Sequence, residues 1–261
     1  MKKVVVLTGG SSGIGKATAE LFAARGWQVF ELSRSGKGGE GITHVRCDVT
    51  DEQSVRDAIA EVMQHTDHID VVLSNAGMGI SGAIEYTREE DARRQMDVNF
   101  FGAFALTKAV LPQLRKQHSG RIIFTSSVAA VLAVPYQAFY SASKAAINAF
   151  ALALQNEVRP FGIRVAVVMP GDVATGFTGA RIKEQQGEDV YTHARQAVEA
   201  MERDEQGGMA PVKMARLIYH VATCRCPRPE YVGGALYRVF CALDCMLPKR
   251  LVNWIEGKMY S

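Results

Sequence analysis

Short apolar runs alternate with longer segments of helical periodicity along most of the chain. The apolar runs lie at Val4–Thr8, Trp27–Ser33, His44–Cys47, Ile69–Ser74, Arg121–Ser126 and Arg164–Met169. The helical segments lie at Gly13–Arg25, Glu52–His65, Glu89–Gln117 and Ala138–Arg159. Because continuously apolar strands need cover on both faces, this alternation predicts a parallel sheet with helices on both sides. No repeat or linker interrupts it, so we expect a single doubly wound α/β domain over residues 1–261.

One connection in this series departs from the pattern. Between Arg34 and Thr43, residues 35–42 include the glycines 36, 38, 39 and 41. Glycine is a poor helix former, so a crossover helix is not expected here. The sequence predicts a flexible loop between the second and third strands.

The composition fits one folded domain and excludes several classes of protein. Hydrophobic residues make up 48% and charged residues 22% of the chain, whereas disorder needs lower hydrophobicity and higher net charge. A net charge of +3 gives no reason to expect a nucleic-acid partner. The five cysteines are odd in number, and Cys224 and Cys226 are too close for a zinc pair. We therefore expect no metal site and reduced thiols that pack as small apolar residues.

The location of the protein is predicted from two further patterns. The apolar run Val4–Leu7 is shorter than the core of a signal peptide, and a Gly/Ser turn follows it instead of a cleavage site. No apolar run approaches the roughly 18 residues of a membrane span. These patterns predict a cytoplasmic protein.

A glycine-rich turn separates the first strand from the first helix. Glycines in such a turn let the backbone approach a phosphate, and the following helix offers free N–H groups and a positive dipole end. In this strand–turn–helix context the turn predicts dinucleotide binding, with a plain loop as the alternative. The residues expected to contact the cofactor here are Gly9, Ser11, Ser12, Gly13, Ile14 and Gly15.

The end of the second strand distinguishes two nicotinamide cofactors. An acidic residue there would bind the ribose 2′-hydroxyl of NAD, but this chain has Ser33 and Arg34. A guanidinium suits a 2′-phosphate because it combines positive charge with a planar fork of donors. We therefore expect NADP(H), with Lys37 as a further contact; a solvated surface arginine is the alternative.

Two further strand ends should border the same cofactor. Asp48 and Val49 follow the third strand, where the Asp48 carboxylate suits the adenine amino group; Asp51 is the more natural helix cap. Asn75, Ala76 and Gly77 follow the fourth strand, at the crevice where open sheets bind ligands. We expect Asn75 to brace the backbone and Gly77 to let the nicotinamide ring approach, and a simple turn is the alternative.

Candidate catalytic groups lie in the helical segment before the fifth apolar run, at the end of that run, and in the helical segment after it. Tyr140 and Lys144 are four residues apart on one helix face, where an ammonium is expected to lower the pKa of the phenol. A tyrosine tuned in this way is a plausible general acid and base. Ser126 and Ser127 end the preceding strand, where a hydroxyl can hold a carbonyl oxygen. Asn99 lies within a long helical segment, and a local bend or a water-holding role would explain it.

These motifs together resemble the short-chain dehydrogenase/reductase superfamily along nearly the whole chain. The resemblance implies a Rossmann fold, a homodimer or homotetramer, and Ser127 as the member of the serine pair that polarises the carbonyl. It implies that Tyr140 transfers the proton, that Lys144 binds the nicotinamide ribose, and that Asn99 holds a water in a proton relay. It also implies a segment that closes over the nicotinamide carboxamide, formed by Pro170, Gly171, Val173 and Thr175.

The substrate is expected to lie against the less regular C-terminal third. We expect residues 176–208 to form a lid, with one or two helices over Ala180–Arg203 and a hinge at Gly207–Gly208. Residues 235–261 form a C-terminal extension with an apolar stripe and a second helix from Pro248. The stripe consists of Leu236, Val239, Phe240, Leu243 and Leu247. It could pack in the core, line the substrate pocket, join subunits or touch a membrane surface.

Together these features predict an NADP(H)-dependent oxidoreductase that interconverts a secondary alcohol and a ketone. The C-terminal extension resembles that of reductases acting on steroids, retinoids or acylated ketones, so an apolar substrate such as a steroid or keto-lipid is expected. A 3-oxoacyl-type reductase of fatty-acid or polyketide metabolism is one alternative, although such enzymes usually end soon after their last strand. A non-catalytic NADP-sensing regulator or a lipid-surface module are the others, and a complete set of proton-transfer residues argues against the regulator.

Overall fold

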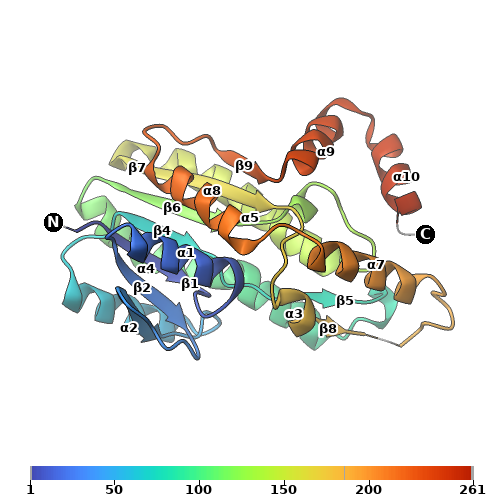
Figure 1. Cartoon of the computed structure of the whole chain (residues 1–261), viewed down its shortest axis with the longest axis horizontal. Helices are drawn as coiled ribbons and strands as arrows, with labels where there is room; N and C mark the ends of the chain where they lie inside the picture. The colour runs from blue at the N-terminus through green and yellow to red at the C-terminus, as the bar shows by residue number, and fades with distance from the viewer. Residues whose placement is uncertain (1, 185, 260–261) are drawn as a thin grey trace.

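The computed structural model describes residues 2–184 and 186–259. Its centre is a parallel sheet whose strands run in the order β3-β2-β1-β4-β6-β7-β9 (Figure 1). The strands are β1 (Val4–Thr8), β2 (Gln28–Ser33), β3 (Ile42–Arg46), β4 (Val71–Ser74), β6 (Gly120–Thr125), β7 (Ile163–Pro170) and β9 (Glu230–Gly233). The order reverses direction between β1 and β4, so the predicted doubly wound sheet is confirmed.

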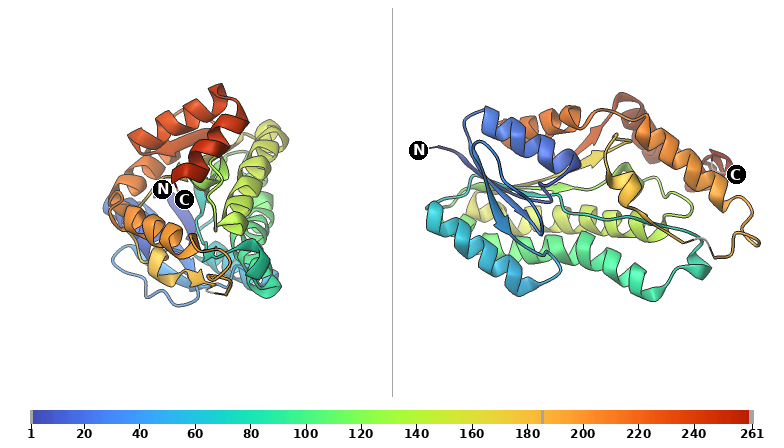
Figure 2. Two further views of the ribbon diagram at one scale, coloured as in Figure 1. Left: turned by 90° about the vertical axis from the view of Figure 1, so that its right-hand side faces the viewer. Right: turned by 60° about the horizontal axis from the view of Figure 1, so that its bottom comes forward.

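Helices cover both faces of this sheet, as the apolar strands require (Figure 2). One face packs against α2 (Glu52–His65), α4 (Gly102–Lys116) and α5 (Ala138–Val158). The other packs against α1 (Gly13–Ala24) and α8 (Pro211–Thr223). Asp51 caps α2 by accepting a hydrogen bond from the Gln53 amide at 2.8 Å, as expected.

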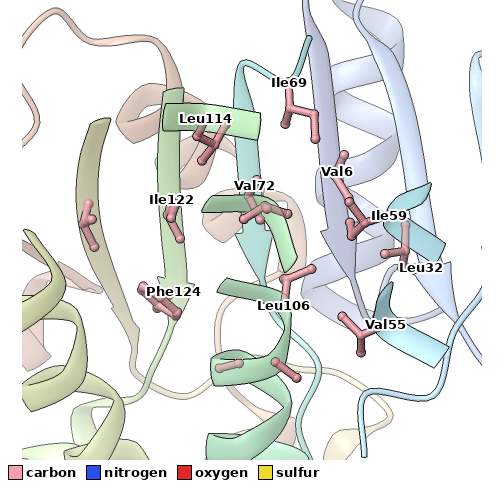
Figure 3. Packing of buried hydrophobic residues seen from close by; sticks show 14 of the residues in the cluster. Val6, Leu32, Val55, Ile59, Ile69, Val72, Leu106, Leu114, Ile122 and Phe124 are labelled. Atoms are coloured by element: carbon pink, nitrogen blue, oxygen red, sulfur yellow. The ribbon is translucent and has the colours of Figure 1, made fainter. Parts of the chain in front are cut away.

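The core under α2 and α4 shows how these layers hold together (Figure 3). Val72 and Ile122 on the sheet meet Leu106 of α4, while Val55 and Ile59 of α2 pack toward the neighbouring strands. Each such side chain contributes about 1.5–3 kcal/mol by leaving water. This packing fixes the strand ends that carry the site.

The predicted long helix over Glu89–Gln117 is interrupted. It consists of α3 (Glu89–Met96), a π-helical turn η2 (Asp97–Phe101) and α4. A π turn admits one extra residue and redirects the chain. The local bend expected at Asn99 is therefore confirmed, and the prediction of one continuous helix is wrong.

The connection between β2 and β3 contains no helix, as predicted. Gly39 and Ile42 exchange backbone hydrogen bonds of 3.0 Å each, which closes a tight turn. Gly38 and Gly41 have φ values of 65° and 72°, a left-handed conformation that favours glycine. The loop is therefore a compact turn with its own hydrogen bonds.

The lid segment differs from the prediction in its first part. After α6 (Phe177–Ala180), the chain forms the strand β8 (Ile182–Lys183), which pairs with β5 (Ile80–Ser81). The helix α7 begins only at Ala194 and ends at Gln206. One of the one or two helices expected over Ala180–Arg203 is confirmed by α7, but its predicted start is wrong, because residues 182–183 satisfy their backbone groups against β5.

The chain ends with α9 (Ala235–Met246) and α10 (Lys249–Met259), so both predicted C-terminal helices are confirmed. They lie beyond the carboxyl ends of β7 and β9, at the same end of the molecule as α7 (Figure 1). Leu236 and Val239 are 60% and 54% exposed, so packing of the stripe in the core is excluded. Short 3₁₀ turns occupy Ile84–Tyr86, Val128–Ala130 and Arg159–Phe161. Residue 185 of the expected lid and residues 260–261 of the expected extension lie outside the described residues.

Candidate active site

The carboxyl ends of the central strands open into a cavity of about 1560 Å³. It runs from the glycine-rich turn past the ends of β4, β6 and β7 to α9 and α10. Nearly all the residues expected from the sequence line it: Gly9, Ser11, Ser12, Gly13, Ile14, Ser33, Arg34, Asp48, Val49, Asn75, Ala76, Gly77, Ser127, Tyr140, Lys144, Pro170, Gly171, Val173 and Thr175. Gly15 and Asn99 do not line the cavity but contact residues that do. Lys37, expected as a further cofactor contact, does not line it either.

The glycine-rich turn is built for a close backbone approach. Gly9 and Gly13 have φ values of 69° and 53°. A Cβ atom at Gly15 would lie 2.1 Å from the Gly9 carbonyl oxygen, so a side chain cannot fit there. The Asn75 amide nitrogen donates to the carbonyl oxygens of Thr8 and Gly9 at 3.2 and 3.3 Å. Asn75 thus braces the turn, which is the role expected of it.

The helix behind this turn offers unpaired donors to the cavity. Ser12 precedes α1 without a side-chain capping bond, and the first turn of α1 has no acidic residue. The first N–H groups of a helix have no intrahelical partner and carry its positive dipole end. A pyrophosphate fits this arrangement.

Positive charge gathers where the second and third strands end. The Thr50 backbone amide lowers the pKa of Asp48, and the charges of Arg34 and Arg94 lower it further. Both guanidinium groups line the cavity and therefore lie near the expected adenine site. Arg94 belongs to α3 and was not predicted, because only the fold brings that helix beside Asp48.

Tyr140 lies in the first turn of α5, and its hydroxyl forms a hydrogen bond with the Ser127 side chain. Burial raises the pKa of Tyr140 to about 12, although the bond with Ser127 acts in the opposite direction. Ser127 also accepts a hydrogen bond from the Ala129 amide at 3.1 Å, which fixes its hydroxyl. The neighbouring Ser126 instead donates to the Lys144 carbonyl oxygen at 3.0 Å and is buried. Of the two serines, Ser127 is the one beside the phenol.

Lys144 is a buried amine one helical turn beyond Tyr140. Its Nζ atom donates to the Thr125 carbonyl oxygen at 3.0 Å and lies 5.7 Å from the centre of the Tyr140 ring. Burial lowers the pKa of Lys144 to about 8. The expected lowering of the Tyr140 pKa by this ammonium is wrong for this structure, because burial of the phenol dominates and the ammonium points at Thr125.

Asn99 holds the π turn against the loop that follows β4. Its Oδ1 accepts from the Met78 amide at 2.8 Å, and its Nδ2 donates to the Met78 carbonyl and to Ser143 Oγ at 3.0 Å each. Gly77 fits between this side chain and Lys144, since a Cβ atom there would lie 3.4 Å from Asn99 Oδ1. Asn99 therefore braces the floor beneath Lys144.

The far end of the cavity is lined by the C-terminal segments. Its apolar wall includes Leu132, Val134, Phe177, Met201, Leu236, Phe240, Leu243, Leu247, Val252 and Ile255. Several polar residues there were not predicted from the sequence, among them Asp172 and Tyr237, whose hydroxyl donates to the Asp172 carboxylate. The position of Asp172, in a motif directly after an apolar strand, was a usable signal. For Tyr237 the sequence contained none.

Metal-binding clusters and membrane-spanning helices are two further features to consider in the described part of the chain. Within residues 2–184 and 186–259, no group of His, Cys, Asp or Glu side chains could hold a metal ion. Over the same described residues, no helix is both long and apolar enough to cross a membrane.

Comparison with known proteins agrees with this geometry. A model of the short chain dehydrogenase family matches residues 3–186. The 3-ketodihydrosphingosine reductase of Bacteroides thetaiotaomicron is 39% identical, and the alignment covers 99% of this chain and 98% of that protein. A short-chain dehydrogenase from Streptomyces avermitilis has a TM-score of 0.84 at 29% identity, covering 99% of this chain and 98% of that one.

A further solved structure carries a nicotinamide cofactor. ElxO with NADP bound has a TM-score of 0.75 at 25% identity, covering 90% of this chain and 99% of that one. The family match covers more than half of the chain, and the relative from Bacteroides covers almost all of it. The chain therefore belongs to the short-chain dehydrogenase/reductase superfamily and is an oxidoreductase.

Proposed function

We propose that this protein is an NADP(H)-dependent reductase that interconverts a ketone and a secondary alcohol on a long-chain keto-lipid. The observation that carries the proposal is the continuity of one cavity. It joins the glycine-rich turn and Arg34 to the Ser127–Tyr140–Lys144 group and then to the apolar faces of α9 and α10. The 39% identical relative, named a 3-ketodihydrosphingosine reductase, supports a keto-lipid over a steroid.

The residues at the centre of the cavity suit carbonyl reduction. With its pKa raised to about 12, Tyr140 keeps its proton at neutral pH and is ready to donate it to a carbonyl oxygen. Ser127, hydrogen-bonded to the same phenol, polarises and positions that oxygen. Lys144 and Asn99 form the buried polar floor below. The nicotinamide supplies the hydride when it is bound.

The cofactor end of the cavity fits NADP(H). The uncapped first turn of α1 and the side-chain-free cradle at Gly9, Gly13 and Gly15 suit the pyrophosphate. Arg34 and Arg94 supply the charge that a ribose 2′-phosphate needs, and β2 ends without a carboxylate to select the 2′-hydroxyl of NAD.

The proton donor is tested by Tyr140→Phe. Loss of the hydroxyl should lower turnover of a long-chain ketone by at least about 100-fold, since general-acid catalysis is worth about 10²–10⁴-fold. The dissociation constant of NADPH, measured by its fluorescence, should change by less than about threefold. Tyr219→Phe, on the opposite face of the sheet, is the matched control. Turnover equal to that of the control would refute this assignment.

The cofactor preference is tested by Arg34→Asp. The dissociation constant of NADPH should rise about 100-fold, as expected for a lost charge-assisted contact with added repulsion, while that of NADH changes little. Arg46→Asp is the control, because Arg46 ends the adjacent strand and does not line the cavity. An unchanged ratio of the two dissociation constants would refute the preference for NADP(H).

We further propose that α9 and α10 rest on an anionic membrane surface. Trp254 is 61% exposed, and other exposed apolar side chains and the basic residues Arg238, Arg250 and Lys258 flank it on these helices. Trp254→Glu should reduce co-sedimentation with acidic vesicles, whereas Val190→Glu, at a residue equally exposed in the lid, should not. Equal co-sedimentation of the two variants would contradict this contact.

The oligomeric state and the compartment of the protein are two further parts of this proposal. Phe101 and Phe104, on the π turn and α4, are exposed aromatic residues that support a homodimer or homotetramer, which light scattering after size exclusion would measure. The five cysteines are free, which supports a reducing compartment such as the cytoplasm.

A further inference from the structure

Charged residues of both signs line the cavity, and Arg203 and Lys213 are among the cations. Arg34 and Arg94 lie at the cofactor end. The substrate end is bordered by carboxylates, namely Asp172, Asp204, Glu205, Asp244 and Glu256. A neutral keto-lipid would need no carboxylates beside its apolar chain. A carboxylate enclosed in this way is costly unless a cation or water neutralises its charge.

Two of these carboxylates have cationic partners within the protein. Glu205 accepts hydrogen bonds from Arg181 and from Thr178, and Arg181 is the ion-pair partner. Asp244 is paired with Lys249 at 2.5 Å. Asp204 is exposed, so water screens its charge. These three carboxylates need nothing further from a substrate. Glu256, on α10, is half-buried; burial and Asp244 raise its pKa and Lys249 lowers it. Glu256 is not among the charged groups that act on Tyr140.

Asp172 differs from them. It is half-buried, and among the described residues no cation lies within ion-pair distance of it. Its bonding partner is the neutral hydroxyl of Tyr237. Burial raises the pKa of Asp172, and the charges of Glu205 and Asp204 raise it further, whereas the bond from Tyr237 and the more distant charge of Arg181 lower it. A cation bound next to this half-buried carboxylate would lower the free energy of its charged form.

The protein also fixes the position of Asp172. The Tyr237 ring packs on the backbone of Gly171, where a Cβ atom would lie 1.9 Å from the ring. On the other side, the Met209 amide donates to the Asp172 carbonyl at 2.9 Å. Gly208 lies against the same peptide, since a Cβ atom there would lie 2.5 Å from the Asp172 carbonyl carbon. A carboxylate positioned this firmly is suited to recognition.

Asp172 is also close enough to act near the reacting carbonyl. Its charge is among those that raise the pKa of Tyr140, and both residues line the same cavity. Asp172 follows the end of β7, and Ser127 follows the end of the neighbouring strand β6. A ketone bound to Ser127 and Tyr140 therefore has its neighbouring carbons within the region that Asp172 borders.

We propose that Asp172 is a specificity-determining residue that binds a protonated amine on the carbon next to the reacting carbonyl. The inference rests on the proposed reductase function and narrows its substrate to a long-chain α-amino ketone. The amine pairs with Asp172 while the alkyl chain follows the apolar residues of α9 and α10. Tyr237 acts through Asp172 as a positioning residue.

The test compares three ketones of one chain length: the α-amino ketone, its N-acetyl derivative and the ketone without nitrogen. Each is assayed with wild type, Asp172→Asn and the control Asp57→Asn, following NADPH absorbance; Asp57 is exposed on α2 and does not line the cavity. Asparagine can still accept the hydrogen bond from Tyr237 but carries no charge. Circular dichroism and the NADPH dissociation constant verify that each variant is folded.

Wild type should prefer the α-amino ketone over the other two in kcat/KM. Asp172→Asn should reduce that preference by about 10- to 100-fold, mainly through KM, because a hydrogen bond to a charged group is worth that much. Asp57→Asn should change the preference by less than about threefold. Tyr237→Phe should reduce it less than Asp172→Asn, since the charge remains.

Two results would overturn the inference and can be told apart. If wild type reduces all three ketones equally well, or if Asp172→Asn lowers kcat/KM equally for all of them, Asp172 does not recognise an amine and the reductase function stands. If wild type reduces none of them, the proposed function itself fails and this inference falls with it.

Discussion

Replacing Lys144 by methionine should stabilise the protein while removing its activity. Lys144 is 5% exposed, and burial lowers its pKa from 10.5 to about 8. Because one pKa unit corresponds to about 1.4 kcal/mol, keeping this amine in the fold costs about 3 kcal/mol at neutral pH. Methionine has a similar shape without the charge, but it loses the hydrogen bond to Thr125, worth about 1–2 kcal/mol. A net gain of about 1–2 kcal/mol is expected, or about 2–8 °C in Tm.

The pH dependence gives this prediction a signature. The pKa of Lys144 is lower in the folded state than in the unfolded chain, so the unfolded chain binds this proton more tightly. Raising the pH from about 8 toward 10.5 therefore stabilises folded wild type. The methionine variant lacks this term, and its advantage should shrink over that range.

Urea unfolding near neutral pH and again near pH 9.5 measures both effects. Lys16→Met is the control, because Lys16 is on the exposed side of α1 and its replacement should change stability by less than about 0.5 kcal/mol. A Lys144→Met variant that is less stable than wild type at neutral pH would refute the reasoning, since burial of the amine would then not be costly. A stability difference between Lys144→Met and wild type that does not change with pH would refute it as well.

Two further substitutions test the supports of the site. Gly15→Ala places a Cβ atom 2.1 Å from the Gly9 carbonyl oxygen, so it should destabilise the fold by about 1–3 kcal/mol and weaken NADPH binding, as thermal unfolding and fluorescence titration would measure. Asn99→Ala removes the bonds to Met78 and Ser143 and should cost about 2–4 kcal/mol in urea unfolding, with a loss of turnover; an unchanged midpoint would show that the π turn needs no such brace.

The parallel sheet could be predicted because its information is local. Runs such as Val4–Thr8 are continuously apolar, and that pattern fits a strand covered on both sides. The cofactor end followed for the same reason, since glycines, Arg34 and Asn75 stand directly at strand ends. In a parallel sheet the carboxyl ends of the strands lie along one edge, so residues directly after a strand can be placed at that edge from the sequence alone.

Features that depend on distant contacts could not be predicted. The sequence indicated a bend at Asn99, but its form as a π turn is set by bonds to Met78 and Ser143, which are 21 and 44 residues away. The strand β8 is two residues long and forms because β5 lies beside it. Arg94 reaches the cofactor end because α3 passes Asp48. The hydrophobic periodicity of the sequence does not indicate such contacts.

The pKa of Tyr140 shows a different limit. Four-residue spacing correctly placed the phenol and the Lys144 ammonium on one helix face, but the balance between burial and charge depends on where Nζ points. In the fold it points at Thr125, and burial raises the pKa of the phenol. Spacing therefore identifies candidates for proton transfer, whereas the direction of their pKa shifts depends on the enclosing structure.

The same reasoning indicates that the substrate end of the site is the part that distinguishes this chain from other proteins of the same fold. The cofactor end is built from backbone and strand ends, whose geometry follows from the fold. The substrate end is built from α7, α9 and α10, which add side chains to a cavity that the sheet has already opened. Tyr237 comes from one of these helices and holds Asp172, which the sheet supplies. Selectivity can therefore change through the C-terminal helices while Ser127, after β6, and Tyr140 and Lys144, on α5, stay in place.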